Sequence, residues 1–197
     1  NRLGGNSLSD LIVFGKIAGE NAANYSKRRV SFSDIAQSEI DEAVEETLEP
    51  LGRDGGENPA KVVSDLREMM QNKAGIIRTG DLLEEAISDL DSLRERADAT
   101  SPGGGRVYNP GWHQALEIGA MIDVSKMCAI AALRREESRG AHTRDDFPET
   151  DHEHWGKVNS VISIGDDGSM NIGFVSYPKI PKELRSLLDS DDLHEEE

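Results

Sequence analysis

The strongest restriction on the fold comes from two matching helix-start signals, Asn58-Pro59 and Asn109-Pro110. An Asn side chain can cap the free N–H groups at the start of a helix, and Pro is well suited to the first helical position. Apolar residues that recur every three or four positions follow each pair, which is the spacing of one helix face. The chain is therefore expected to be mainly α-helical.

The same period predicts five helices, with approximate bounds 6–25, 32–51, 59–70, 79–97 and 111–135. Ser31 or Ser33 is expected to cap the second helix, and Thr79 opens the fourth. The second to fourth helices are expected to form an antiparallel, spectrin-repeat-like three-helix bundle with short connections. The fifth is apolar on most sides and is the expected central, buried helix.

A different pattern follows the helices. VNSVISI and SMNIGFVSY flank the turn sequence GDDG, which predicts a β-hairpin that ends at Pro178 and Pro181. The residues from 184 to 197 are mostly acidic and are expected to be disordered.

Composition excludes several classes of function. The net charge of −16 makes nucleic acid an unfavourable partner. No apolar run approaches the ~20 residues needed to span a bilayer, and no signal peptide is visible. The single cysteine, Cys128, excludes an internal disulfide framework and is interpreted as a small buried apolar residue.

The first eight residues, Asn1–Leu8, contain two glycines between Arg2 and the start of a helix. Glycine lets the backbone approach a ligand closely, and a helix start presents N–H donors to negative charge. Arg2 has the planar fork that suits a carboxylate. The pattern fits a site for a carboxylate beside a group that becomes anionic. On these residues alone, an ordinary loop-to-helix turn with a surface arginine is the simpler interpretation.

Four segments resemble the C-terminal portion of the flavoprotein subunits of succinate dehydrogenase and fumarate reductase. They are NRLGGNSLSDLIVFGKIAGE at 1–20, DGGEN followed by Pro59, YNPGW at 108–112, and ESRGAHTRDDFPETD at 137–151. The resemblance covers nearly the whole chain, and the chain starts at Asn1 inside the first motif. We therefore expect a fragment of such a subunit.

The resemblance implies that Arg2 binds a carboxylate of succinate or fumarate. It also implies that Ser7 and Leu8 contact the flavin ring and that Asn6 shapes the same turn. The cofactor would be FAD in the full-length parent, and this chain alone is not expected to retain it. No catalytic residue is assigned here, because the proton-transferring arginine, the substrate histidines and the dinucleotide-binding motif lie upstream in the family.

The expected activity is succinate oxidation by hydride transfer to FAD. Fumarate reductase, which runs in reverse, and L-aspartate oxidase remain alternatives, as does a non-catalytic docking module. The partners implied are an iron–sulfur subunit and membrane-anchor subunits, with a peripheral location on the cytoplasmic side of the membrane. The expected division is 1–28, the last helix of an FAD-binding domain; 29–138, the helical bundle; 139–183, a loop and hairpin; and 184–197, the tail.

The second motif begins at Glu137 and has two interpretations. Arg139 and His142 could support the flavin domain or a partner surface. The favoured interpretation is a network of ion pairs and hydrogen bonds with Glu137, Asp145 and Asp146 that anchors a loop. The charges of the neighbouring residues 134–136 are expected to be solvated. No metal site is expected, because the His and acidic residues at 151–154 match no standard zinc spacing, and Trp112 and Trp155 are interpreted as packing residues.

Overall fold

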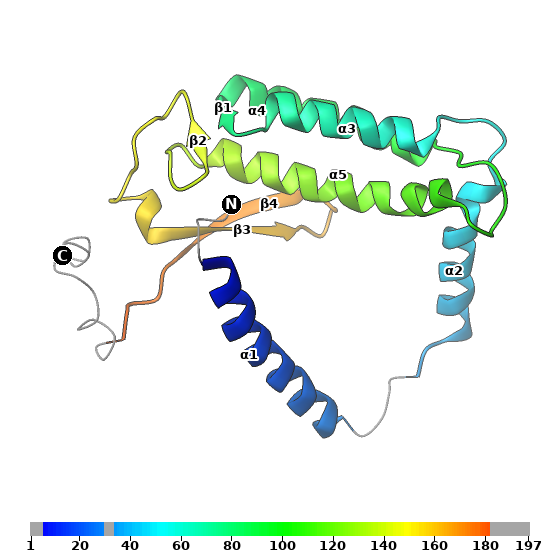
Figure 1. Cartoon of the computed structure of the whole chain (residues 1–197), viewed down its shortest axis with the longest axis horizontal. Coiled ribbons are helices and arrows are strands. Elements are labelled where there is room, and N and C mark those ends of the chain that lie inside the picture. Colours follow the sequence, from blue (N-terminus) through cyan, green and yellow to red (C-terminus); the bar gives the residue numbers. More distant parts are fainter. Residues whose placement is uncertain (1–5, 30–33, 182–197) are drawn as a thin grey trace.

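The computed structural model describes residues 6–29 and 34–181, and within these ranges the chain is mainly α-helical (Figure 1). The helices are α1 (Asn6–Arg28), α2 (Gln37–Leu48), α3 (Pro59–Lys73), α4 (Gly80–Asp98) and α5 (Pro110–Arg134), with short 3-10 helices η1 (Glu49–Gly52) and η2 (Trp155–Lys157). The strands are β1 (Ile77–Arg78), β2 (Thr143–Arg144), β3 (Val158–Ile164) and β4 (Met170–Ser176).

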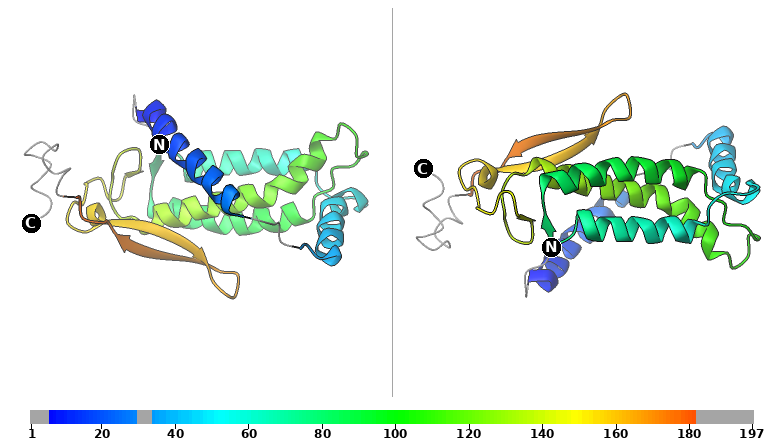
Figure 2. Two further views of the ribbon diagram at one scale, coloured as in Figure 1. Left: turned by 90° about the horizontal axis from the view of Figure 1, so that it is seen from below. Right: turned by 90° about the horizontal axis from the view of Figure 1, so that it is seen from above.

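A bundle of three helices, α3, α4 and α5, contains the hydrophobic core (Figure 2). Each helix contributes apolar side chains spaced three or four residues apart, so that one face of each is buried. The buried apolar residues are Val62, Val63, Leu66 and Met69 of α3, Leu83, Ala86, Leu90, Leu93 and Ala97 of α4, and Ile118, Ile122, Ala129 and Ala132 of α5.

The three-helix bundle is confirmed, but the prediction that it begins with the second helix is wrong. No residue of α2 is buried, and α2 meets the rest of the protein chiefly through η1. The physical reason is that α2 has only a narrow apolar stripe, whereas α5 has enough apolar surface to complete a core. α5 takes the place in the bundle that the sequence analysis gave to α2.

Side-chain caps fix the start of each bundle helix. The Asn58 side chain accepts a hydrogen bond from the Ala60 N–H at 2.9 Å, and the Asn109 side chain accepts one from the Trp112 N–H at 3.0 Å. Thr79 caps α4 in the same way. These three caps confirm the start signals. Helix α2 begins only at Gln37, and the predicted caps at positions 31 and 33 lie outside the described residues.

Helix α5 is apolar around most of its circumference but is buried on one face only. Leu116 and Val124 are exposed, and so is Cys128, which the sequence analysis had placed in the interior. The run around Cys128 is apolar on every side, so its composition could not indicate which face the bundle covers.

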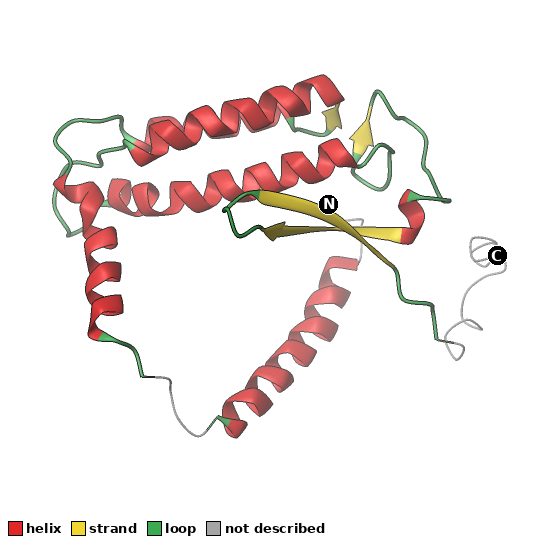
Figure 3. Ribbon diagram, turned by 180° about the vertical axis from the view of Figure 1, so that it is seen from behind, coloured by secondary structure: helices red, strands yellow, loops and turns green. Residues whose placement is uncertain are grey.

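The β3–β4 hairpin lies along α5, as Figures 1 and 3 show, and confirms the predicted hairpin. Its strands are antiparallel, with Val158 opposite Ser176 and Ile164 opposite Met170. Gly168, at φ 78°, closes the turn by donating its N–H to the Gly165 carbonyl at 2.9 Å. A second, parallel pair joins β1 to β2 at one end of the bundle.

Helix α1 stands apart from the bundle (Figure 3). Its large apolar side chains are exposed, namely Leu8, Leu11, Ile12, Val13, Phe14 and Ile17. A row of this length on one helix is more apolar surface than an isolated domain usually leaves uncovered.

Candidate functional site

The predicted flavin residues Asn6, Ser7 and Leu8 lie at the start of α1. Arg2 lies outside the described residues, and Asn6 is the first residue of the helix. Ser7 is half-buried, whereas Leu8 is 71% exposed. No acidic residue lies in the first turn, so no local carboxylate neutralises the partial positive charge of the helix start. This end of α1 is chemically suited to an anionic or electron-accepting ligand.

The second motif forms a cluster of arginines and carboxylates where α5 ends. At its centre is Glu137, whose side chain is completely buried. Arg135 Nη1 donates to Glu137 Oε1 at 2.5 Å, and Arg139 donates to both carboxylate oxygens at 3.0 and 3.2 Å. The Asp151 N–H adds a hydrogen bond of 2.9 Å to Oε2. The loop after α5 is therefore wrapped around one buried negative charge.

The pKa of Glu137 follows from these contacts. Burial raises the pKa of a carboxyl group, but the hydrogen bonds from Arg139, the Asp151 N–H and Arg135 outweigh that effect. The net result is a pKa below the ordinary value for Glu137. Its side chain is ionised at neutral pH and balances two guanidinium groups.

Arg144 joins the end of α5 to the start of α4. Its side chain is 2% exposed, and its Nη1 donates to the carbonyls of Ala132 and Leu133 at 2.9 and 3.0 Å. These carbonyls belong to the last turn of a helix, where no intrahelical donor remains for them. The other side of the guanidinium forms two parallel hydrogen bonds of 2.7 Å with Asp146. Asp146 in turn accepts the Gly80 N–H at 2.8 Å.

The surroundings of this bridge stabilise the charged form of Asp146. The hydrogen bonds from Arg144 hold the pKa of Asp146 well below its ordinary value; burial opposes them, and the Gly80 N–H lowers the pKa further. A carboxylate at the start of α4 and a guanidinium at the end of α5 also match the dipoles of the two helices. The bridge holds two bundle helices at one end.

His142 bridges β1 and the residue after α5. Its Nδ1 lies 3.0 Å from Arg78 Nη1, and its Nε2 lies 3.2 Å from the Arg135 carbonyl oxygen. Burial lowers the pKa of His142 below its ordinary value, and the positive charges of Arg78, Arg144 and Arg135 lower it further. The hydrogen bond to the Arg135 carbonyl acts in the opposite direction but does not prevail.

Arg135 also anchors the hairpin. Its guanidinium donates to the carbonyls of Trp155 and Val158 at 3.1 and 3.0 Å, and it lies over the Trp155 ring at 5.3 Å. The sequence analysis placed this charge in solvent, which is wrong, because the loop returns over the end of α5. Trp155 is buried against Phe174 with ring centroids 5.2 Å apart, so its predicted packing role is confirmed.

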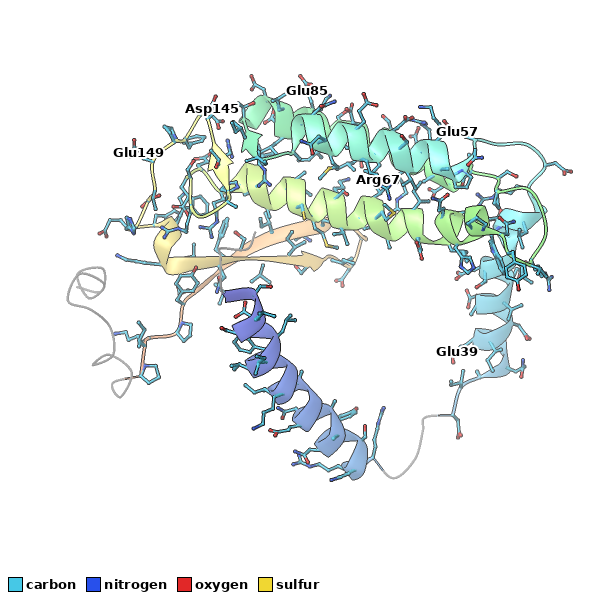
Figure 4. All side chains as sticks on the ribbon, viewed as in Figure 1. Glu39, Glu57, Arg67, Glu85, Asp145 and Glu149 are labelled. Carbon is cyan, nitrogen blue, oxygen red and sulfur yellow. The ribbon has the colours of Figure 1, made fainter. Side chains whose placement is uncertain are left out.

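Within the second motif, the favoured network interpretation holds for Glu137, Arg139 and Asp146. Figure 4 places Asp145 and Glu149 at this end of the bundle and Glu57 at the opposite end. Asp145 contributes its backbone N–H, which donates to the Arg78 carbonyl at 2.9 Å. The sequence analysis missed Arg78 and Arg144. The only available signal for Arg144 was the adjacent acidic pair, and nothing in the sequence marks a carbonyl twelve residues earlier as its partner.

The donors of this cluster are directed at carboxylates and carbonyls of the chain itself. The arrangement anchors a loop rather than presenting a nucleophile or an acid–base pair. Across residues 6–29 and 34–181, no three His, Cys, Asp or Glu side chains converge as metal ligands would. In the same part of the chain, no helix has both the length and the hydrophobicity needed to cross a bilayer.

Comparison with known proteins identifies the family. Residues 63–186 match the family described as the fumarate reductase flavoprotein C-terminus. The chain belongs to this family. Among the relatives, the fumarate reductase flavoprotein subunit of Mycobacterium tuberculosis H37Rv is 37% identical over 183 residues, which are 89% of this chain and 31% of the relative. The succinate dehydrogenase flavoprotein subunit of Coxiella burnetii is 33% identical over 79% of this chain and 27% of its own length.

A solved structure agrees with the family. The Mycobacterium smegmatis Sdh1 complex in the apo form contains a chain that is 37% identical, with a TM-score of 0.85 over 98% of this chain and 33% of its own length. The chain therefore spans about a third of the length of these flavoproteins. The match includes nearly all of it, from the separate first helix through the bundle to the hairpin.

Proposed function

We propose that the chain is the C-terminal part of the flavoprotein subunit of a succinate dehydrogenase, which oxidises succinate to fumarate by hydride transfer to FAD. The observation that carries this proposal is the likeness to the M. smegmatis Sdh1 chain over 98% of the sequence, with a TM-score of 0.85. The chain corresponds to only 33% of that protein. Activity therefore belongs to the longer parent, and this chain alone is a structural and docking module.

The start of α1 is the part of the chain that would meet the substrate and the flavin. Arg2 would bind one carboxylate of the dicarboxylate through paired hydrogen bonds. Asn6, Ser7 and Leu8 would place the first N–H groups of α1 beside the flavin ring. The absence of acidic residues in the first turn supports this role. Bound FAD would supply two-electron acceptance, and the helix start would stabilise the negative charge that develops.

The exposed apolar residues of α1 support a large intramolecular interface in the parent. Six large apolar side chains between Leu8 and Ile17 are exposed, four of them, Leu8, Leu11, Ile12 and Phe14, by more than 60% of their area. We propose that 1–28 closes the FAD-binding domain, that 29–138 and 139–183 form the bundle and the loop with its hairpin, and that 184–197 is a tail. The parent would join an iron–sulfur subunit and membrane-anchor subunits on the cytoplasmic side of the membrane.

The test compares this chain with its full-length parent by flavin absorbance and by succinate-dependent dye reduction. The parent should show both, and the chain neither. In the parent, Arg2→Lys should weaken succinate binding and turnover at least about tenfold, because the second hydrogen bond of the fork is lost. Arg28→Lys, at the other end of α1, is the matched control and should change neither. Unchanged kinetics for Arg2→Lys would refute the substrate assignment.

Fumarate reductase is the second candidate, and the M. tuberculosis relative that carries this name favours it. Both directions use the same dicarboxylate site. Measuring succinate oxidation and fumarate reduction with the same parent preparation distinguishes them by relative rate. L-aspartate oxidase is tested in the same assay with L-aspartate as the substrate, and turnover of aspartate alone would replace the succinate assignment.

A further inference from the structure

The two hydrogen bonds of His142 define its protonation state. Arginine nitrogens are donors only, so Nδ1, at 3.0 Å from Arg78 Nη1, must be the acceptor. The ring proton then lies on Nε2, which donates to the Arg135 carbonyl at 3.2 Å. The contact with Arg78 exists only while the ring is neutral. A protonated ring would point an N–H at a guanidinium N–H, with two positive charges at hydrogen-bond distance.

The charged groups around the ring offer no compensation for a second proton. Arg78 faces it from β1, Arg135 from the end of α5, and Arg144 from β2, and all three oppose protonation. The backbone of His142 also pairs with that of Arg139 through two hydrogen bonds of 2.9 Å. The ring therefore lies near three arginines, which come from β1, from the end of α5 and from β2.

The nearby carboxylates are engaged elsewhere. Glu137 accepts hydrogen bonds from Arg135 and Arg139, and Asp146 accepts two from Arg144 and one from the Gly80 N–H. The Asp145 side chain is exposed to solvent. Glu137 and Asp146 already have guanidinium partners, so an imidazolium at position 142 would gain no ion pair with either of them without competing with an arginine.

We propose that His142 is an acid-sensitive latch that joins β1 to the loop after α5. Neutral His142 holds Arg78, and Arg78 is further fixed by its Nε bond of 2.7 Å to the Gly75 carbonyl. This places β1 beside β2, with Ile77 opposite Thr143 and Arg78 opposite Arg144. When the ring takes up a proton from solvent, the Arg78 contact becomes repulsive and the short parallel pair opens.

The other contacts of the loop determine how much of the structure opens. The hairpin is anchored separately, through Arg135 and Trp155. The apolar core is formed by buried side chains of α3, α4 and α5, packed against one another. Opening should therefore be local to β1, β2 and the loop between α5 and β2, and it should expose the β2 edge without unfolding the bundle.

The experiment measures amide hydrogen exchange of Asp145, whose N–H donates to the Arg78 carbonyl, between pH 7.5 and pH 5. After correction for intrinsic exchange, the equilibrium constant for opening at this amide should rise as the pH falls. The expected rise is about tenfold per pH unit in the range between the ordinary His pKa of ~6.5 and the lowered pKa of His142. NMR titration of the His142 ring gives that lower limit. Amides of Leu66 and Leu90 in the core should show no such change.

Two variants distinguish the proposed latch from an overall loss of stability at acidic pH. His142→Gln keeps one donor and one acceptor but cannot titrate, so Asp145 opening should become independent of pH in this window. His113→Gln, at an exposed position on α5, is the matched control and should behave like the unsubstituted chain. A pH dependence that survives in His142→Gln overturns the proposal. So does a constant Asp145 opening while the His142 ring titrates.

Discussion

Single side chains hold the loop after α5 in place, and Glu137 is the one on which most of them converge. It is fully buried and accepts hydrogen bonds from two guanidinium groups and one backbone N–H. A buried ion pair contributes little compared with apolar packing, but removing one partner leaves an uncompensated buried charge. The loop should therefore be far more sensitive at this position than at its exposed neighbours.

Glu137→Gln should lower the free energy of unfolding by about 3 kcal/mol, because Arg135 and Arg139 lose their shared counter-charge while the volume is unchanged. Urea unfolding at pH 7 measures the change. Glu136→Gln, one residue earlier and exposed, is the control and should stay within about 0.5 kcal/mol. Equal effects of the two substitutions would show that Glu137 does not anchor the loop.

The Asp146–Arg144 pair should give the protein an acid-sensitive stability. The pKa of Asp146 is lower in the folded chain than its ordinary value of ~3.9 in the unfolded chain, so the unfolded chain takes up the proton first as the pH falls. The contribution is complete above about pH 5 and is lost progressively below about pH 4.

Free energies of unfolding measured from pH 6 to pH 3 should decline less steeply for Asp146→Asn than for the unsubstituted chain. Asp145→Asn, at the adjacent exposed position, should keep the original slope. Identical slopes for all three chains would contradict the role given to Asp146.

For single residues, contacts between neighbours in the sequence could be predicted, and contacts between residues far apart in the sequence could not. Glu137 and Arg139 are two residues apart, and their opposite charges lie in one short motif, so an ion pair between them follows from spacing. Arg78 and His142 are 64 residues apart. Their contact depends on how α3, α4 and α5 pack, which no local pattern specifies.

Among the elements, helix starts were predictable because a cap and the residues it serves are neighbours in the sequence. Which helices form the bundle could not be predicted, because this depends on which apolar faces pack together best. Helix α2 illustrates the difference. Its attachment includes a hydrogen bond of 2.8 Å from Trp112 Nε1 to the Thr47 carbonyl, and an open groove of about 600 Å³ lies between α2 and Trp112.

Gly56 occupies the tightest position in the turn before α3. Gly56 has φ +118°, and a Cβ built on it would lie 2.5 Å from the Ala99 carbonyl oxygen, where the chain passes beside the end of α4. Gly56→Ala should destabilise the chain by about 2 kcal/mol or more, since both strain and a backbone clash result. Gly52→Ala, where a Cβ meets nothing within 4 Å, should change thermal stability little. Similar melting temperatures for both variants would exclude a special role for Gly56.

In the molecule as a whole, part of the apolar surface is buried in the core of the bundle and part is exposed to solvent. The bundle buries one face of each of its helices, while α1 and the outer face of α5 leave Phe14 and Val124 64% and 57% exposed. This division is what the family comparison leads one to expect of a chain that is a third of its relatives' length. Apolar surface of this kind favours association with other protein surfaces.

The isolated chain should therefore self-associate through α1. Phe14→Glu should weaken this association at least about tenfold, because burial of a Phe side chain contributes about 1.5–3 kcal/mol. Lys16→Glu adds negative charge to the same helix at an exposed ion-paired position and serves as the control. Sedimentation velocity at several concentrations measures the effect. No difference between the two variants would mean that α1 does not form the contact.

The exposed position of Cys128 gives the chain a built-in attachment point for spectroscopic labels. It is the one cysteine of the sequence, so a maleimide dye or a nitroxide would react at a single place without any engineered thiol. The label would sit beside Val124 on the outer face of α5 and would report whether that face becomes covered. Fast labelling of the isolated chain and slow labelling of the same residue within the parent would map the assembled surface directly.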